Sequence, residues 1–226
     1  MDSERSSLRS RPDSKKRSAL WNRLLTKPEQ LREILRMGYH CSSVTLRHYD
    51  EIEAGLYLGD MKTAKSLMHL EKLGVTHIIN AAYTPSPYTD RELSQEYYEY
   101  RNFDCYFFGI AALDFPSFKI GLYFEETTNF IHDALKNGGK ILIHCQVGVS
   151  RSATIVLAYL MMKRKMSAIE AVAYVGAIRP IYPNMGFLEQ ICELEYRLKN
   201  PRNVLVRSLS TMSRRTFSKV FRRNKK

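Results

Sequence analysis

The stretch from residue 140 to residue 163 constrains the fold more than any other part of the chain. It begins with the continuous apolar run "KILIHC", passes through a short loop that contains Gly148, and continues as the apolar segment "RSATIVLAYLMM". A run without polar alternation is typical of a central strand in a parallel sheet, because such a strand is covered on both faces. The stretch therefore predicts a buried strand, a tight loop and a buried helix, in that order.

The rest of the chain supplies further strands and helices in alternation. Short strands are expected within residues 51–60, 75–82 and 103–110. Helices are expected before and between them, at residues 27–38, 61–74 and 118–139. Three more helices follow the apolar strand; the second opens with a capping box from Ser167 to Glu170, and Asn184 caps the third. This alternation predicts a single α/β domain with a central, mostly parallel sheet flanked by helices on both faces.

The net charge of +12 is concentrated at the two ends of the chain. Residues 1–27 have a net charge of +5 and residues 201–226 a net charge of +9, whereas residues 28–200 hold 18 basic and 20 acidic side chains. We therefore expect a folded domain at 28–200 between a disordered Ser/Arg-rich basic tail and a basic C-terminal tail. A nucleic-acid-binding fold would carry its basic residues across the domain itself, so no specific nucleic-acid partner is expected.

The four cysteines indicate a reducing compartment. They are Cys41, Cys105, Cys145 and Cys192, and their spacing fits neither a disulfide framework nor a zinc site. The N-terminal residues contain no apolar signal core, and no stretch approaches the roughly 18 apolar residues of a membrane span. We expect an intracellular, soluble protein in the cytoplasm, the nucleus or both.

The loop between the apolar strand and the apolar helix has the features of an anion site. Unpaired amides at a helix N-terminus attract negative charge, and Gly148 allows the loop to curl around one phosphate. Arg151 adds a planar, two-pronged donor, and the same positive field lowers the pKa of the Cys145 thiol. These features favour phosphoryl transfer to sulfur. The alternative is a structural cysteine beside a surface arginine; a nucleotide-binding loop of the Gly-x4-Gly-Lys type is excluded because the lysine is missing.

The motif His144-Cys145-x-x-Gly148-x-x-Arg151-Ser152 resembles the signature of cysteine-dependent protein phosphatases. Over about residues 28–200 the chain resembles the atypical dual-specificity phosphatases, through "GLYLGD", "LEKLGVTHIINAA", "HCQVGVSRSATIVLAYLMM" and "YPNMGFLEQICELEYRL". The resemblance implies the phosphatase α/β fold and no metal or organic cofactor. It also implies a shallow pocket that accepts phosphotyrosine and phosphoserine or phosphothreonine in proteins.

The resemblance implies a role for each residue of the motif. Cys145 would be the nucleophile, and Arg151 with the loop residues would hold the phosphate: Gln146, Val147, Gly148, Val149 and Ser150. His144 would orient the loop by hydrogen bonding, and Ser152 would help to expel the thiolate in the second step. The alternatives are a core histidine with satisfied hydrogen bonds and an ordinary serine at a helix N-terminus.

A general acid is also needed, because an unprotonated alkoxide or phenoxide is a poor leaving group. Asp133 falls within a helix opposite its apolar stripe, and Asp104 precedes a strand, so both are expected to be surface residues. Asp114 follows a strand at its carboxyl end, where α/β proteins build their sites. The family also places its acid in this loop, which favours Asp114; the alternative is an aspartate that only bends the loop or caps the next helix.

The loop composition favours a phosphoprotein substrate. It lacks the lysines of phosphoinositide-specific relatives and the Asn-Arg-Thr-Gly pattern of RNA triphosphatases. A phosphoprotein-binding scaffold with little or no activity is the alternative, although degenerate relatives typically lose the cysteine or the arginine. The Tyr-rich segment near residues 83–101 either borders the site or is a variable surface excursion.

The basic C-terminal tail has two interpretations. It is a disordered basic or nuclear-localisation segment, or it folds against an anionic membrane or an acidic partner. The second interpretation depends on apolar residues that gather on one side of a helical wheel: Leu205, Leu209, Met212, Phe217 and Val220. The sequence leaves the oligomeric state open.

Overall fold

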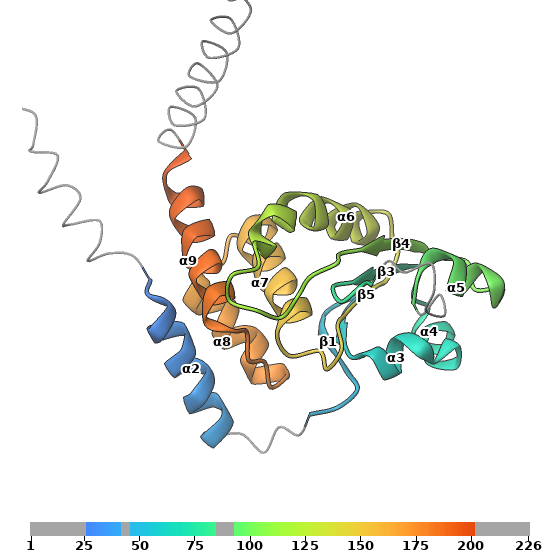
Figure 1. Cartoon of the computed structure of the whole chain (residues 1–226), viewed down its shortest axis with the longest axis horizontal. Coiled ribbons are helices and arrows are strands. Elements are labelled where there is room, and N and C mark those ends of the chain that lie inside the picture. The colour runs from blue at the N-terminus through green and yellow to red at the C-terminus, as the bar shows by residue number, and fades with distance from the viewer. Residues whose placement is uncertain (1–25, 42–45, 85–92, 202–226) are drawn as a thin grey trace, which may run out of the picture.

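The computed structural model describes residues 26–41, 46–84 and 93–201, and these form one α/β domain around a five-stranded sheet (Figure 1). The strand order is β1-β2-β5-β3-β4, and every neighbouring pair is parallel except β1 with β2. The strands are β1 (Tyr49–Glu53), β2 (Leu56–Gly59), β3 (His77–Asn80), β4 (Tyr106–Gly109) and β5 (Ile141–His144). The apolar run of the sequence is thus the central strand, as predicted.

Side chains of each strand alternate between two hydrophobic clusters, one on each face of the sheet. On β5, Ile141 and Ile143 belong to the larger cluster and Leu142 to the smaller. The same alternation places Ile79 of β3 in the larger cluster and Ile78 in the smaller one. Because successive side chains of a strand point to opposite faces, both faces of the sheet are packed against helices.

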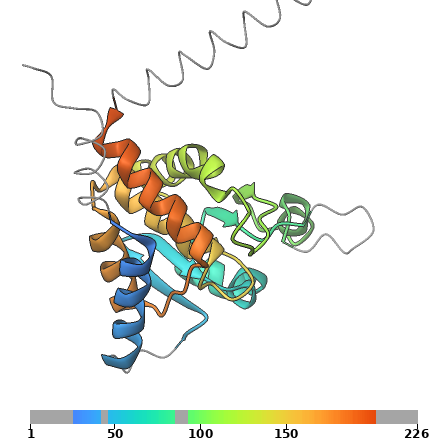
Figure 2. The same cartoon turned by 60° about the vertical axis from the view of Figure 1, so that its left-hand side comes forward.

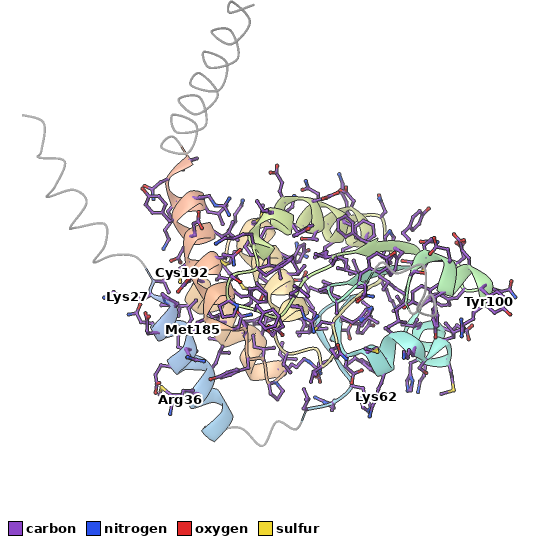
Figure 3. The ribbon with its side chains drawn as sticks, in the orientation of Figure 1. Lys27, Arg36, Lys62, Tyr100, Met185 and Cys192 are labelled. Atoms are coloured by element: carbon purple, nitrogen blue, oxygen red, sulfur yellow. The ribbon has the colours of Figure 1, made fainter. Side chains whose placement is uncertain are left out.

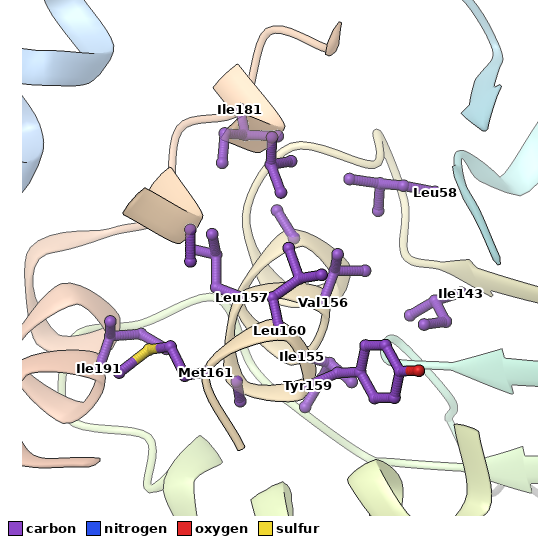
Figure 4. Packing of buried hydrophobic residues seen from close by; sticks show 14 of the residues in the cluster. Leu58, Ile143, Ile155, Val156, Leu157, Tyr159, Leu160, Met161, Ile181 and Ile191 are labelled. Carbon is purple, nitrogen blue, oxygen red and sulfur yellow. The ribbon is translucent and has the colours of Figure 1, made fainter. Parts of the chain in front are cut away.

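Helices α6 (Phe124–Lys136), α7 (Arg151–Lys163), α8 (Ala168–Ile178) and α9 (Met185–Lys199) lie on the side of the larger cluster. Helix α7 is apolar all round and almost completely buried, as expected for a helix at the centre of a core. Figure 4 shows Leu58 and Ile143 of the sheet on one side of α7 and Ile191 of α9 on another. Helix α2 (Pro28–Cys41) packs outside this layer, against α8 and α9 (Figure 2).

The opposite face of the sheet is covered by α3 (Met61–Lys65), α4 (Leu67–Leu73) and α5 (Gln95–Tyr100) (Figure 1). The side chain of Asp60 accepts a hydrogen bond from the Thr63 N–H and caps α3, and Gly74 ends α4 in the left-handed conformation with φ 70°. The start of α3 is thereby held immediately after β2, next to the carboxyl end of the central strand.

Several predicted elements have different limits in the structure. The helix expected at 27–38 continues through Gly38 to Cys41, and the segment 61–74 is divided into α3 and α4 at Ser66. The strand expected at 51–60 is a hairpin, with Gly55 in its turn at φ 79°. The first turn of the helix expected at 118–139 is a 3-10 helix, η1 (Ile120–Tyr123).

The helix starts predicted from caps are confirmed. The Ser167–Glu170 capping box begins α8, and the Asn184 side chain accepts a hydrogen bond from the Phe187 N–H at the start of α9. No helix within the described ranges is long and apolar enough to cross a membrane. The two basic tails lie almost entirely outside the described residues, and the predicted domain limits of 28 and 200 stay predictions.

Candidate active site

Cys145 lies at the carboxyl end of the central strand, where β5 passes into the loop 146–150 and then into α7. The flanking parallel strands β2 and β3 end at the same level, since Gly59 and Asn80 both pair with His144. The loops that follow these strands therefore meet around Cys145. The Cys145 side chain is buried, with 2% of the residue exposed, at the base of the loop.

Hydrogen bonds to sulfur stabilise the thiolate of Cys145. Burial alone would raise the pKa of this thiol, but two hydrogen bonds from Ser152, the Arg151 charge and a hydrogen bond from Gly148 outweigh it. The pKa of Cys145 is therefore below its ordinary value. The Ser152 hydroxyl and the Gly148 N–H both donate to Sγ at 3.2 Å.

The carbonyl groups of the loop accept hydrogen bonds from residues on the outer side of the loop. Arg179 donates from Nε to the Gly148 carbonyl at 2.9 Å and from Nη2 to the Val147 carbonyl at 3.3 Å. The backbone N–H of Met61 donates to the Gln146 carbonyl, and the Tyr182 N–H to the Val149 carbonyl.

A trans peptide directs its N–H opposite to its C=O, and the described residues contain no cis peptide bond. The N–H groups that follow these four carbonyls, at residues 147–150, therefore point to the concave side of the loop. The Gly148 N–H, which donates to the Cys145 sulfur, follows this rule. The loop thus presents consecutive donors around Cys145, an arrangement suited to the oxygens of one phosphate group.

The loop conformation requires glycine at position 148. Gly148 has φ +76°, and a Cβ atom there would lie 2.4 Å from the Gly59 carbonyl oxygen and 2.8 Å from Nη2 of Arg179. A side chain would therefore separate the loop both from the end of β2 and from the arginine that holds its carbonyls.

Arg151 is the first residue of α7 and reaches across to the loop that follows β4. Its Nη1 donates to the Ala112 carbonyl at 3.1 Å, which fixes the direction of the guanidinium. Its Nε is buried and has no hydrogen-bond partner among the described residues. A buried arginine donor that makes no hydrogen bond, beside a ring of amides, fits a site for an anion.

Of the three candidate acids, the structure brings only Asp114 to the loop. Its Oδ1 accepts hydrogen bonds from the Ser150 hydroxyl at 2.7 Å and from Asn184 Nδ2 at 2.8 Å. Its Oδ2 lies 3.7 Å from Arg151 Nε, and 38% of its side chain is exposed. Asp104 and Asp133 are exposed at the opposite end of the domain, before β4 and in the last turn of α6.

The predicted role of His144, orienting the loop by hydrogen bonding, stays a prediction. It is buried at the end of β5, and neither ring nitrogen has a hydrogen-bond partner among the residues that the structure describes. Burial lowers the pKa of His144 to about 4. The backbone of Cys145 and the Asp60 carboxylate act in the opposite direction, but their effects on this pKa are smaller. The ring is therefore neutral at physiological pH and packs beside the nucleophile position.

Two residues of the site were missed by sequence reasoning. Arg179 is completely buried and pairs with Asp50 at 2.7 Å, in addition to its bonds to the loop. An arginine between an apolar helix and Pro180 was the available signal. Asn184 was predicted as a helix cap alone, although its Nδ2 also donates to Asp114.

The described part of the chain contains no group of three or more His, Cys, Asp or Glu side chains placed to hold a metal ion. The groups that converge on Cys145 are backbone amides, a hydroxyl and a guanidinium.

The chain is similar to known phosphatases over most of its length. The family model described as dual specificity phosphatase, catalytic domain, matches residues 56–197. Dual specificity protein phosphatase 26 of Bos taurus is 42% identical over 168 residues, which cover 74% of this chain and 76% of that protein. Human dual specificity protein phosphatase 13B is 38% identical over 172 residues, covering 76% and 84%. The crystal structure of human DUSP28 matches with a TM-score of 0.57 at 26% identity, over 70% of this chain and 99% of that one.

The family model thus spans more than half of the chain, including the central strand, the loop and the helices around them. The relatives share about 40% of their residues with it over three quarters of its length. A cradle of amides with a stabilised thiolate at its base is the arrangement that phosphoryl transfer to cysteine needs. The chain belongs to the dual-specificity protein phosphatases, enzymes that hydrolyse phosphate esters on proteins through a cysteinyl-phosphate intermediate.

Proposed function

We propose that Cys145 is the nucleophile of this phosphatase and that Arg151 and the amides of residues 146–151 bind the phosphate. The observation that carries the proposal is the convergence, on one loop, of a stabilised thiolate, inward N–H groups and a guanidinium whose Nε makes no hydrogen bond to the described residues. These donors face the position where the equatorial oxygens of the phosphoryl group gain negative charge in the transition state.

In the first step, the Cys145 thiolate attacks phosphorus, an S–P bond forms, and the P–O bond to the substrate side chain breaks. The leaving oxygen takes its proton from the Asp114 carboxyl group. In the second step, Asp114 accepts a proton from water, whose oxygen attacks phosphorus while the S–P bond breaks. The Ser152 hydroxyl, 3.2 Å from Sγ, stabilises the thiolate that leaves, and inorganic phosphate is released.

The position of Asp114 supports its role as the acid. Its Oδ1 is held from two sides by Ser150 and Asn184, while its exposed fraction leaves room for a substrate. The neutral ring of His144 acts in this proposal as a packed support below the loop, without a proton-transfer role.

The substrate of the proposed site is a phosphorylated side chain of a protein. Exposed apolar side chains at the rim suit contact with a polypeptide: Leu113 and Phe115 on either side of Asp114, and Val147 in the loop. Hydrolysis of phosphotyrosine and of phosphoserine or phosphothreonine in signalling proteins would take place in the cytoplasm or the nucleus. The three cysteines whose side chains are described are free thiols, which supports a reducing compartment.

The basic segment 201–226, outside the described residues except Pro201, would add contacts to an anionic membrane or an acidic partner. Its nine basic and no acidic side chains support this part of the proposal.

The roles of Cys145 and Asp114 are tested by comparing a phosphoserine peptide with an aryl phosphate. Cys145→Ser should abolish turnover of both, while phosphate binding is retained because the amides and Arg151 remain. Asp114→Asn should lower kcat on the phosphoserine peptide by about 10²–10⁴-fold, because the alkoxide needs a proton. The loss should be much smaller with an aryl phosphate whose phenol is already acidic. An equal loss on both substrates, or the same leaving-group dependence in Asp104→Asn, would show that Asp114 is not the acid.

A further inference from the structure

The acid loop, residues 110–119 with Asp114 near its centre, joins β4 to η1 and has little hydrophobic packing of its own. Residues 113–117 are all exposed. Buried apolar side chains lie before and after this stretch, at Ile110, Ala112 and Ile120. Burial of apolar side chains is what usually fixes a segment in a fold, so the position of Asp114 depends on polar contacts instead.

The first turn of α9 lies directly against the acid loop. In Figure 3, Met185 marks this turn of the helix and Cys192 a later one. A Cβ atom on Gly186 would overlap the carbonyl group of Pro116, so the backbones of the helix and the loop are in contact at this point. Glycine allows this approach because it has no Cβ atom, and the approach brings the next turn of α9 within hydrogen-bonding reach of the loop.

Gln190, one turn after Gly186, bonds the end of the acid loop to α9. Its Nε2 donates to the Phe118 carbonyl at 2.9 Å, and its Oε1 accepts a hydrogen bond from the Gly121 N–H at 2.8 Å. Nε2 also donates to the Gly186 carbonyl at 2.9 Å, which fixes the side chain along its own helix. The side chain is buried, and these bonds use both N–H donors and the carbonyl of its amide. Because a carbonyl only accepts and an N–H only donates, the amide has one possible orientation.

Asp114 lies between two anchored points of the acid loop. On the β4 side, Arg151 donates to the Ala112 carbonyl at 3.1 Å. On the η1 side, Gln190 donates to the Phe118 carbonyl. The segment between these two carbonyls is short, so anchoring both of its ends restricts where the carboxyl group of Asp114 can lie.

We propose that Gln190 is a positioning residue for the general acid: by bonding the end of the acid loop to α9, it holds Asp114 in place before a substrate binds. The proposal rests on the proposed function, in which Asp114 gives its proton to the leaving oxygen. Gln190 acts through the loop and not on the phosphate. Its loss should therefore weaken proton transfer to the leaving group and leave the amides around Cys145 intact.

The first test replaces Gln190 by methionine, which has a similar size but cannot bond to Phe118 or Gly121. On a phosphoserine peptide, kcat/KM should fall roughly ten- to hundredfold, because a small displacement of the acid weakens proton transfer to the alkoxide. On an aryl phosphate whose phenol is already acidic, kcat/KM should stay within about twofold of the wild type. Vanadate affinity should be unchanged, because the amides and Arg151 remain.

Gly186→Ala tests the acid loop from a second point and keeps the proposal testable if Gln190→Met does not fold. The added methyl group displaces Pro116 while Gln190 is retained. Since residues 113–117 are exposed, the loop can move away from the helix without unfolding it. The same difference between the phosphoserine peptide and the aryl phosphate is expected.

Tyr98→Phe is the control for a loss of stability alone. The Tyr98 hydroxyl donates to the Ala64 carbonyl at 3.1 Å and is buried on the face of the sheet away from α9. This variant also removes a buried hydrogen bond, but kcat/KM on both substrates should equal that of the wild type.

A double variant shows whether Gln190 acts through Asp114. In an Asp114→Asn background, Gln190→Met should cause no further loss on the phosphoserine peptide, because the acid is already absent. Additive losses would overturn the proposal, and so would an equal loss of Gln190→Met on both substrates. If Asp114→Asn itself lowers both substrates equally, the proposed function fails instead.

Discussion

Replacing Arg179 by methionine should damage both the stability of the domain and the shape of the phosphate loop. The guanidinium is completely buried and donates to four acceptors: the carbonyls of Arg47, Val147 and Gly148, and the Asp50 carboxylate. Removing one partner of a buried ion pair costs about 3–5 kcal/mol, because the remaining charge stays buried. The cost should lie toward the lower end, since Arg47 still pairs with Asp50. We expect a loss of roughly 3 kcal/mol in the free energy of unfolding.

Two further variants separate stability from loop shape. Arg179→Lys keeps a positive charge for Asp50 but cannot reach several acceptors with one planar fork, so it should be more stable than the methionine variant. Combining Asp50→Asn with Arg179→Met removes the carboxylate charge that has lost its buried partner and should also recover part of the stability. In all three variants the carbonyls of Val147 and Gly148 no longer accept hydrogen bonds in the wild-type geometry. Anion binding should therefore be weaker than in the wild type in each of them.

Urea denaturation and calorimetric titration with vanadate would measure the two effects. Vanadate affinity should fall at least about tenfold in every Arg179 variant, equivalent to about 1.4 kcal/mol or the loss of one hydrogen bond to the loop. If Arg179→Lys binds vanadate as tightly as the wild type, then the loop keeps its inward amides without Arg179, and our account of its shape is wrong.

Three other predictions concern the residues around sulfur and the acid. Asn184→Ser keeps a cap for α9 but removes the amide donor to Asp114, so kcat on a phosphoserine peptide should fall about fivefold, with little change on an aryl phosphate. A loss of thermal stability without this leaving-group dependence would limit Asn184 to capping. Iodoacetamide near pH 6.5 should alkylate Cys145 well before Cys105, because burial raises the pKa of Cys105 to about 12 while that of Cys145 is lowered. Ser152→Ala should move the alkylation profile of Cys145 to higher pH, since a hydrogen bond to the thiolate is lost; an unmoved profile would contradict the role of the serine.

Local features of the sequence determined the central strand, the loop and the helix of the site. Residues 140–163 are contiguous, so an apolar run, Gly148 and an apolar helix suffice to place Cys145 and Arg151 around one loop. The caps at Ser167 and Asn184 were predictable for the same reason, because each depends on a residue three positions away.

Tertiary structure decided which distant side chains complete the site. Arg179 meets Gly148 across 31 positions and Arg47 across 132, and Asp114 meets Asn184 across 70. No periodicity or local motif encodes such contacts, since they depend on how the loops converge at the carboxyl ends of the strands. Local propensity sets where helices and strands form, whereas packing of remote elements sets where they end and which polar groups they share.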